Sequence, residues 1–176
     1  MKLPIYLDNS ATTPVDPRVV EKMLPWLAGQ FGNPASSSHS FGHAARAAVE
    51  AARDQVAALV NADPREIIWT SGATESNNLA IKGLAWSRGG VVPMAHLAVE
   101  HYSVTRAMAF LERQGHPVDV IGVQATGLPD QDSLARVLDG RPALVAIQHA
   151  NNEVGTIQDV EALAARIHEA GGLILV

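Results

Sequence analysis

Short apolar runs alternate with segments of helical periodicity from residue 66 onward, and this alternation constrains the fold more than any other feature. The apolar runs predict strands at 66–70, 91–95, 118–123, 143–149 and 172–176. The segments between them predict helices at 73–87, 102–114, 130–138 and 159–170. Residues 144–147 are apolar at every position, which is typical of a strand buried on both faces. We therefore expect an α/β fold, with a mostly parallel sheet and helices on both faces.

The first part of the chain has a different pattern. Residues 1–16 predict an extended arm. Asp16 and Pro17 predict a helix start, with Asp as N-cap and Pro at the first helical position. That helix runs to about Leu27, and Gly29 ends it. A Gly/Pro/Ser-rich loop follows, and a long alanine-rich helix is expected from Phe41 to about Asn61.

Composition excludes several classes of protein. Hydrophobic residues make up 47% of the chain and charged residues 18%, which predicts a packed core rather than disorder. The net charge of −5 leaves no basic excess to neutralise the phosphates of a nucleic acid. The chain contains no cysteine, so it has no disulfide, thiolate metal site or thiol nucleophile.

Targeting signals are not expected either. No apolar run approaches the roughly 20 residues that span a bilayer. The first four residues lead directly into a polar motif, so we expect no secretory or transit segment. The cytoplasm is the simplest expected location.

The stretch Thr70–Asn78 has the layout of a phosphate-binding turn. It follows the apolar run Ile67-Ile68-Trp69 and opens a helical pattern. Small residues allow the backbone to approach an anion, and the first amide groups of a helix have no intrahelical partner. Thr74 adds a hydroxyl donor. A strand-to-helix turn of this composition also fits an ordinary helix N-cap, and both interpretations stay open.

Two more polar segments follow apolar runs. Parallel sheets bind ligands in the loops that follow the carboxyl ends of their strands. Glu100 and His101 precede a helical pattern, and His149-Ala150-Asn151-Asn152-Glu153-Val154-Gly155 follows the run that includes 144–147. A histidine near a helix start is also a common structural or surface residue, and adjacent asparagines also favour turns. His39 and His43 are spaced as a metal-binding edge, but no third ligand is evident, so we predict no metal site.

Taken together, these segments resemble one family, the pyridoxal-phosphate-dependent cysteine desulfurases of the class-V aminotransferase group. The N-terminal block Tyr6–Pro14 and the loop Gly32–Ser36 also match that family, in the family's order. The resemblance covers essentially the whole chain. It implies the front part of the large domain of a fold-type-I pyridoxal-phosphate enzyme, with an arm at 1–16 and an incomplete cofactor-binding domain at 17–176.

The resemblance also implies roles for individual residues. Ala73 and Thr74 would contact the cofactor phosphate. His101 would stack on the cofactor ring and is a candidate for proton transfer, and Asn152 would contact the ring near its phenolic oxygen. His149 and Glu153 would support their loop. Tyr102 stands where relatives often have lysine, which predicts a different pocket rim. The two N-terminal blocks would shape the active-site entrance and the dimer contact.

The implied reaction converts L-cysteine to L-alanine and leaves sulfur as an enzyme persulfide. That sulfur would serve iron–sulfur cluster assembly or thiolation, through a scaffold or sulfur-acceptor protein, and the enzyme would be a homodimer. The family's Schiff-base lysine, the aspartate at the pyridine nitrogen and the nucleophilic cysteine have no counterpart among these residues. Lys82 is eight residues beyond Thr74 and does not replace that lysine. The chain alone is expected to be inactive, prone to aggregation or obligately oligomeric. The alternatives are a non-catalytic fragment and another class-V relative such as a selenocysteine lyase.

Overall fold

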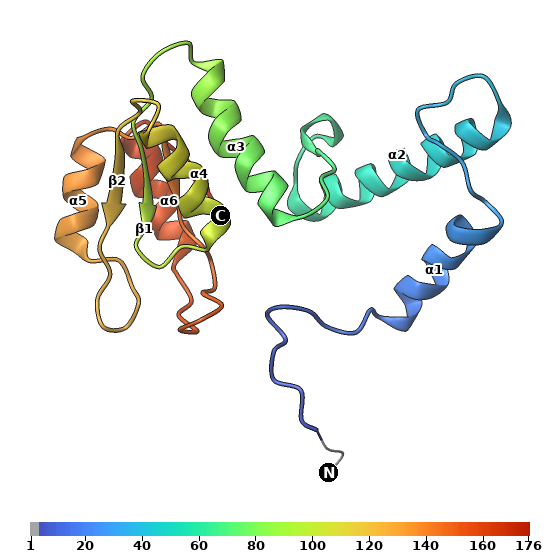
Figure 1. The fold of residues 1–176 in the computed structure, drawn as a ribbon, viewed down its shortest axis with the longest axis horizontal. Coiled ribbons are helices and arrows are strands. Elements are labelled where there is room, and N and C mark those ends of the chain that lie inside the picture. Colours follow the sequence, from blue (N-terminus) through green and yellow to red (C-terminus); the bar gives the residue numbers. More distant parts are fainter. Residues whose placement is uncertain (1–3) are drawn as a thin grey trace. The chain divides into compact units, whose positions relative to one another are not determined.

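A computed structural model describes residues 4–176 of the chain (Figure 1). These residues belong to two compact units, divided between Trp69 and Thr70. The first unit contains three helices and the second contains a sheet with four helices. Among the described residues, no helix is long and apolar enough to cross a membrane.

The first unit consists of α1 (Pro17–Ala28), α2 (Ser40–Val60) and the 3₁₀ helix η1 (Pro64–Glu66). Asp16 caps α1 by accepting from the Arg18 amide, and Gly29 is its C-cap, as the sequence predicted. The C-cap of α2 is Asn61, whose left-handed backbone (φ 54°) is one that asparagine tolerates.

The second unit alternates helices and strands: α3 (Ala73–Ser87), β1 (Met94–Leu97), α4 (Tyr102–Glu112), β2 (Val118–Ile121), α5 (Gln131–Asp139), β3 (Leu144–Ala146), α6 (Val160–Glu169) and β4 (Leu173–Leu175). All strand pairs are parallel, and the order across the sheet is β2-β1-β3-β4. The expected α/β fold with a parallel sheet is confirmed.

Helices cover both faces of this sheet, because side chains along each strand alternate between two separate cores. On one face α3 and α4 pack against residues such as Met94, Leu144 and Ala146. On the other face α5 and α6 pack against residues such as Ala95 and Val145. The residues of the central strands are buried on both faces, which explains why β1 and β3 are apolar except for the buried His96.

One predicted strand is absent. Residues 66–70 form no strand in the structure. Ile67 follows η1 with extended backbone, and its amide donates to the Pro64 carbonyl. Its carbonyl accepts from the Arg53 guanidinium of α2, and that guanidinium carbon lies 5.8 Å from the centre of the Trp69 ring. An extended apolar segment becomes a strand only with a partner, and no described segment pairs with residues 66–70.

Candidate functional site

The chain reverses direction across the sheet between β1 and β3. These strands are neighbours, but β1 leads through α4 to β2 on one side, whereas β3 leads through α6 to β4 on the other. Open α/β sheets bind ligands at such a point, beyond the carboxyl ends of the strands. A pocket of about 320 Å³ lies there, lined by Ala98, Val99, Glu100, His101, Tyr102, Thr105, Asn151, Asn152, Glu153 and Val154.

Asn151 holds the two loops of this pocket together. Its side chain is buried, with 7% of its surface exposed. Its oxygen accepts from the amides of Glu153 (2.9 Å) and Val154 (2.8 Å), which shapes the turn after β3. Its nitrogen donates to the Val99 carbonyl at 2.8 Å, in the loop after β1. These three hydrogen bonds fix the pocket wall, and a fourth, longer one at 3.4 Å is donated to the Gln148 side-chain oxygen.

Glu100 ties the same two loops a second time. One of its carboxylate oxygens accepts from the Gln148 amide at 2.6 Å. Burial raises the pKa of Glu100 above the ordinary glutamate value, and the hydrogen bond from Gln148 and the nearby His101 only partly oppose that shift. A carboxyl group with a raised pKa beside a histidine is a common feature of functional sites.

His101 stands at the start of α4 as its N-cap. Its Nδ1 accepts from the Ser103 amide at 3.1 Å and lies 2.8 Å from the Ser103 hydroxyl oxygen. The same hydroxyl accepts from the Asn77 side chain of α3 at 2.8 Å. Ser103 of α4 thus contacts the histidine ring directly and Asn77 of α3 contacts it through Ser103, while Nε2 is the ring nitrogen left for a ligand.

Asn152, next to the buried Asn151, is exposed on the pocket wall. Its side-chain oxygen accepts from the side-chain nitrogen of Gln148 at 3.2 Å. The side-chain nitrogen of Asn152 is the end left to donate to a ligand. The structure thus brings His101 and Asn152, both predicted as site residues, into one pocket.

Ala73 and Thr74 begin α3, after Gly72 as N-cap. Gly72 has φ 157° and ψ 179°, a region that only glycine adopts readily, and it provides no side-chain cap. The first amides of α3 are therefore open to an anion. Glu75 turns back instead to accept from the Ser71 amide and hydroxyl, and the hydroxyl is the main cause of its lowered pKa.

Thr74 lines a second pocket of about 780 Å³ between α3 and α4. This pocket shares Tyr102 and Thr105 with the pocket of His101, so the two are neighbours. Lys82 also lines it, and its Nζ lies 4.5 Å from the centre of the Phe110 ring. Of the other lysines, Lys22 lies on α1 and Lys2 lies outside the described residues.

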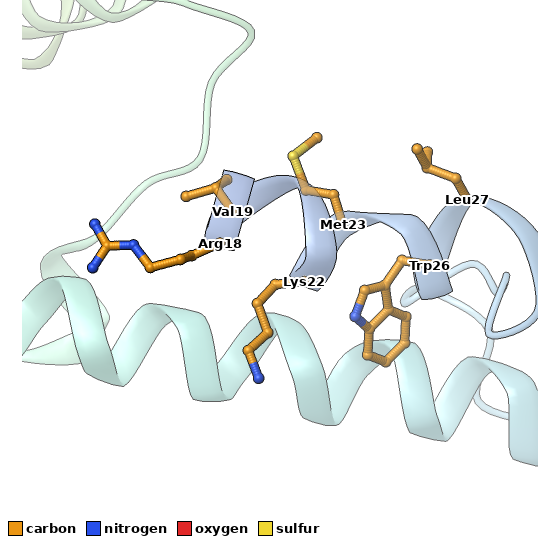
Figure 2. A pocket seen from close by; sticks show the side chains of 6 residues that line it. All are labelled: Arg18, Val19, Lys22, Met23, Trp26 and Leu27. Carbon is orange, nitrogen blue, oxygen red and sulfur yellow. The ribbon is translucent and has the colours of Figure 1, made fainter. Parts of the chain in front are cut away.

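The remaining candidates have structural roles. His39 caps α2 by accepting from the Gly42 amide, and His43 donates to the Ser37 carbonyl. Within residues 4–176 no three histidine, cysteine, aspartate or glutamate side chains gather closely enough to bind a metal. A shallow apolar pocket of about 560 Å³ lies on α1, and Figure 2 shows the six side chains that line it, Arg18, Val19, Lys22, Met23, Trp26 and Leu27. Neither a histidine nor a carboxylate side chain is among these six residues.

Sequence reasoning missed three residues: Asn77, Ser103 and Asn151. Asn77 and Ser103 are 26 positions apart, and only the packing of α3 on α4 brings them together. Asn151 did carry a signal, since two adjacent amides follow a buried strand, but the sequence does not tell which one points inward.

Comparison with known proteins gives a consistent result. The family model "Aminotransferase class-V" matches residues 5–176. "Cysteine desulfurase IscS" from Dechloromonas aromatica (strain RCB) is 52% identical over 173 residues, which are 97% of this chain and 43% of that protein. Among solved structures, "NIFS-LIKE PROTEIN" matches with a TM-score of 0.90 and 36% identity, over 97% of this chain and 47% of that one. "SspA in complex with cysteine" matches with a TM-score of 0.86 and 37% identity, over 96% and 49%.

The chain thus spans less than half the length of the relatives that it matches.

Proposed function

Because the chain belongs to the class-V aminotransferase family, whose members depend on pyridoxal phosphate, we propose that it forms the front part of a cysteine desulfurase. The observation that carries this proposal is the pocket between the β1 and β3 loops, where His101 and Asn152 lie together. The match to "SspA in complex with cysteine" supports L-cysteine as the substrate.

The residues of the site fit two parts of the cofactor. The open amides at the start of α3, with the Thr74 hydroxyl, suit a phosphate group. The His101 ring and the Asn152 amide suit the face and the phenolic oxygen of a pyridine ring. Among the described residues, the pocket of His101 is not lined by a lysine, so the cofactor linkage has no candidate there. The bound cofactor would supply the electron sink for the reaction.

In the proposed reaction, the C–S bond of L-cysteine breaks and a bond forms between its sulfur and a thiol of the enzyme. The thiol proton ends on the product carbon, so L-alanine and a persulfide balance the equation. The role of this chain is to hold the cofactor, to place His101 for proton transfer and to exclude water from the pocket. No cysteine occurs in these 176 residues, so the accepting thiol belongs to another part of the enzyme.

The proposal extends to the setting of the enzyme. We place it in the cytoplasm as a homodimer that passes sulfur to an iron–sulfur scaffold or another acceptor protein, since the relatives are named as IscS enzymes. In this proposal, residues 1–16 form an N-terminal arm and residues 17–176 form an incomplete cofactor-binding domain. The alternative activity, that of a selenocysteine lyase, shares the same pocket.

A chimera tests this function directly. The chain replaces the matched segment of the Dechloromonas aromatica enzyme, and alanine formation from L-cysteine and from L-selenocysteine is measured with cofactor added. We expect turnover of L-cysteine, and a decrease of about 100-fold or more in the His101→Ala chimera, as for loss of a general acid or base. The exposed Glu112→Gln is the matched control and should leave the rate unchanged. A chimera that binds cofactor but forms no alanine would refute the proposal.

The chain alone provides the complementary measurement. With pyridoxal phosphate, L-cysteine and a reductant, it should form no alanine above a free-cofactor control, because it has no thiol nucleophile. Stoichiometric alanine would contradict this expectation.

A further inference from the structure

The side chains around His101 form a directed series of hydrogen bonds. The Asn77 side-chain nitrogen, which only donates, lies 2.8 Å from the Ser103 hydroxyl oxygen. That oxygen lies 2.8 Å from Nδ1 of His101. Since the hydroxyl accepts from Asn77, its own proton is free to point at Nδ1. Ser103 is buried, with 7% of its surface exposed, so water does not compete freely for these bonds.

The backbone adds a second donor to the same nitrogen. The Ser103 amide donates to Nδ1 at 3.1 Å. A neutral imidazole has one protonated nitrogen and one acceptor nitrogen. With two donors directed at Nδ1, that nitrogen is the acceptor and the proton resides on Nε2.

We propose that Asn77 and Ser103 are positioning residues that hold His101 as its Nε2–H tautomer, with this N–H as the group offered to a ligand. The inference rests on the proposed function for the identity of that ligand, a pyridoxal phosphate ring and its substrate. The tautomer itself follows from the hydrogen bonds alone. Asn77 orients the hydroxyl, and Ser103 transmits that orientation to the ring.

Other histidines of the chain provide internal references. His116 also accepts at Nδ1, from the Val92 amide at 3.0 Å, but without a serine hydroxyl. His96 is the opposite case, because its Nδ1 lies 2.7 Å from the Leu97 carbonyl and must donate to it. The same spectrum therefore contains one histidine of each tautomer, both in the unit that contains His101.

The experiment is ¹⁵N NMR of the full chain labelled at histidine, at mildly alkaline pH and without ligand. Protonated and unprotonated ring nitrogens have well-separated shifts, and solid-state spectra give them even for an associated chain. We expect His101 to resemble His116, with an unprotonated Nδ1, and to differ from His96. A protonated Nδ1 on His101 would overturn the inference at once.

Three variants test this relay, the series of hydrogen bonds from Asn77 through Ser103 to His101. Ser103→Ala removes the hydroxyl and should increase the share of the Nδ1–H tautomer of His101 about fivefold, the factor for one net hydrogen bond. Ser103→Thr keeps the hydroxyl and should preserve the wild-type signature. Asn77→Asp changes almost no volume but accepts the hydroxyl proton, so it should act like Ser103→Ala. The references His96 and His116 should stay unchanged in all three.

Each other outcome counts against the relay. An unchanged His101 in Ser103→Ala or Asn77→Asp shows that the backbone amide alone sets the tautomer. If Ser103→Thr behaves like Ser103→Ala, side-chain size and not the hydroxyl matters. If Ser103→Ala also shifts the His96 and His116 signals, that variant has changed the structure more widely. The result for Asn77→Asp then supports or overturns the inference. The tautomer is measured without ligand, so its outcome does not depend on the proposed function. If the variants change the tautomer as expected but the chain fails to bind pyridoxamine 5′-phosphate, the proposed function is refuted and this inference stands.

Discussion

Replacing Asn151 by alanine tests how the pocket wall is held. The side chain makes four hydrogen bonds. Two are accepted from the amides of Glu153 and Val154, one is donated to the Val99 carbonyl, and a long one at 3.4 Å is donated to the Gln148 side-chain oxygen. A net hydrogen bond contributes about 1 kcal/mol, and a buried group left unpaired costs about 1–3 kcal/mol. The two amides lie in an exposed turn where water replaces the lost acceptor, whereas Val99 is half-buried. We therefore expect Asn151→Ala to lower the free energy of unfolding by about 2–3 kcal/mol.

The neighbouring Asn152 is a matched control, since it has the same side chain but is exposed and makes one hydrogen bond at 3.2 Å. Asn152→Ala should change the stability by less than about 0.5 kcal/mol. Chemical denaturation followed by circular dichroism measures both variants on the same chain. Equal stabilities for the two variants would refute the reasoning that Asn151 joins the loops after β1 and β3.

Two more predictions concern Glu100 and two glycines, Gly72 at the N-cap of α3 and Gly83 within that helix. Burial raises the folded-state pKa of Glu100, so the stability that its protonated form contributes is present at low pH and is lost as pH rises from the ordinary glutamate value through the raised one. Glu100→Gln keeps an oxygen for the Gln148 amide and should flatten this decline, which denaturation across a pH series measures; parallel curves would contradict it. Gly72→Ala should destabilise by about 1–3 kcal/mol because of its backbone conformation, whereas Gly83→Ala, mid-helix with open space around the new methyl, should stabilise by about 0.5–1 kcal/mol. Thermal unfolding compares the two, and the same sign for both would exclude this explanation.

The sheet could be predicted because a strand that is buried on both faces has apolar residues at consecutive positions. Residues 144–147 are apolar throughout, and β3 lies there at Leu144–Ala146. The predicted strand extended to residue 149, but Gln148 and His149 belong to the polar loop. The segment 66–70 shows the limit of such patterns, because apolar residues in extended backbone look the same with or without a partner strand.

The site could be predicted only in part, for a related reason. His101 and Asn152 follow strands, and parallel strands place such residues at one edge of the sheet, so their meeting in one pocket follows from topology. Their roles toward a cofactor stay predictions. The contact of Asn77 with Ser103 depends on how α3 and α4 are rotated against each other, which periodicity determines only to within a face of a helix.

Binding of pyridoxamine 5′-phosphate to the chain tests the central claim most directly, because this ligand has the phosphate and ring of the cofactor but needs no lysine linkage. Amide and side-chain NMR shifts are followed during titration, with pyridoxamine and inorganic phosphate as separate ligands. We predict changes at Ala73 and Thr74 for both phosphate-containing ligands, and at His101 and Asn152 for both ring-containing ligands. No binding, or shifts confined to other residues such as those of the α1 pocket, would contradict the account.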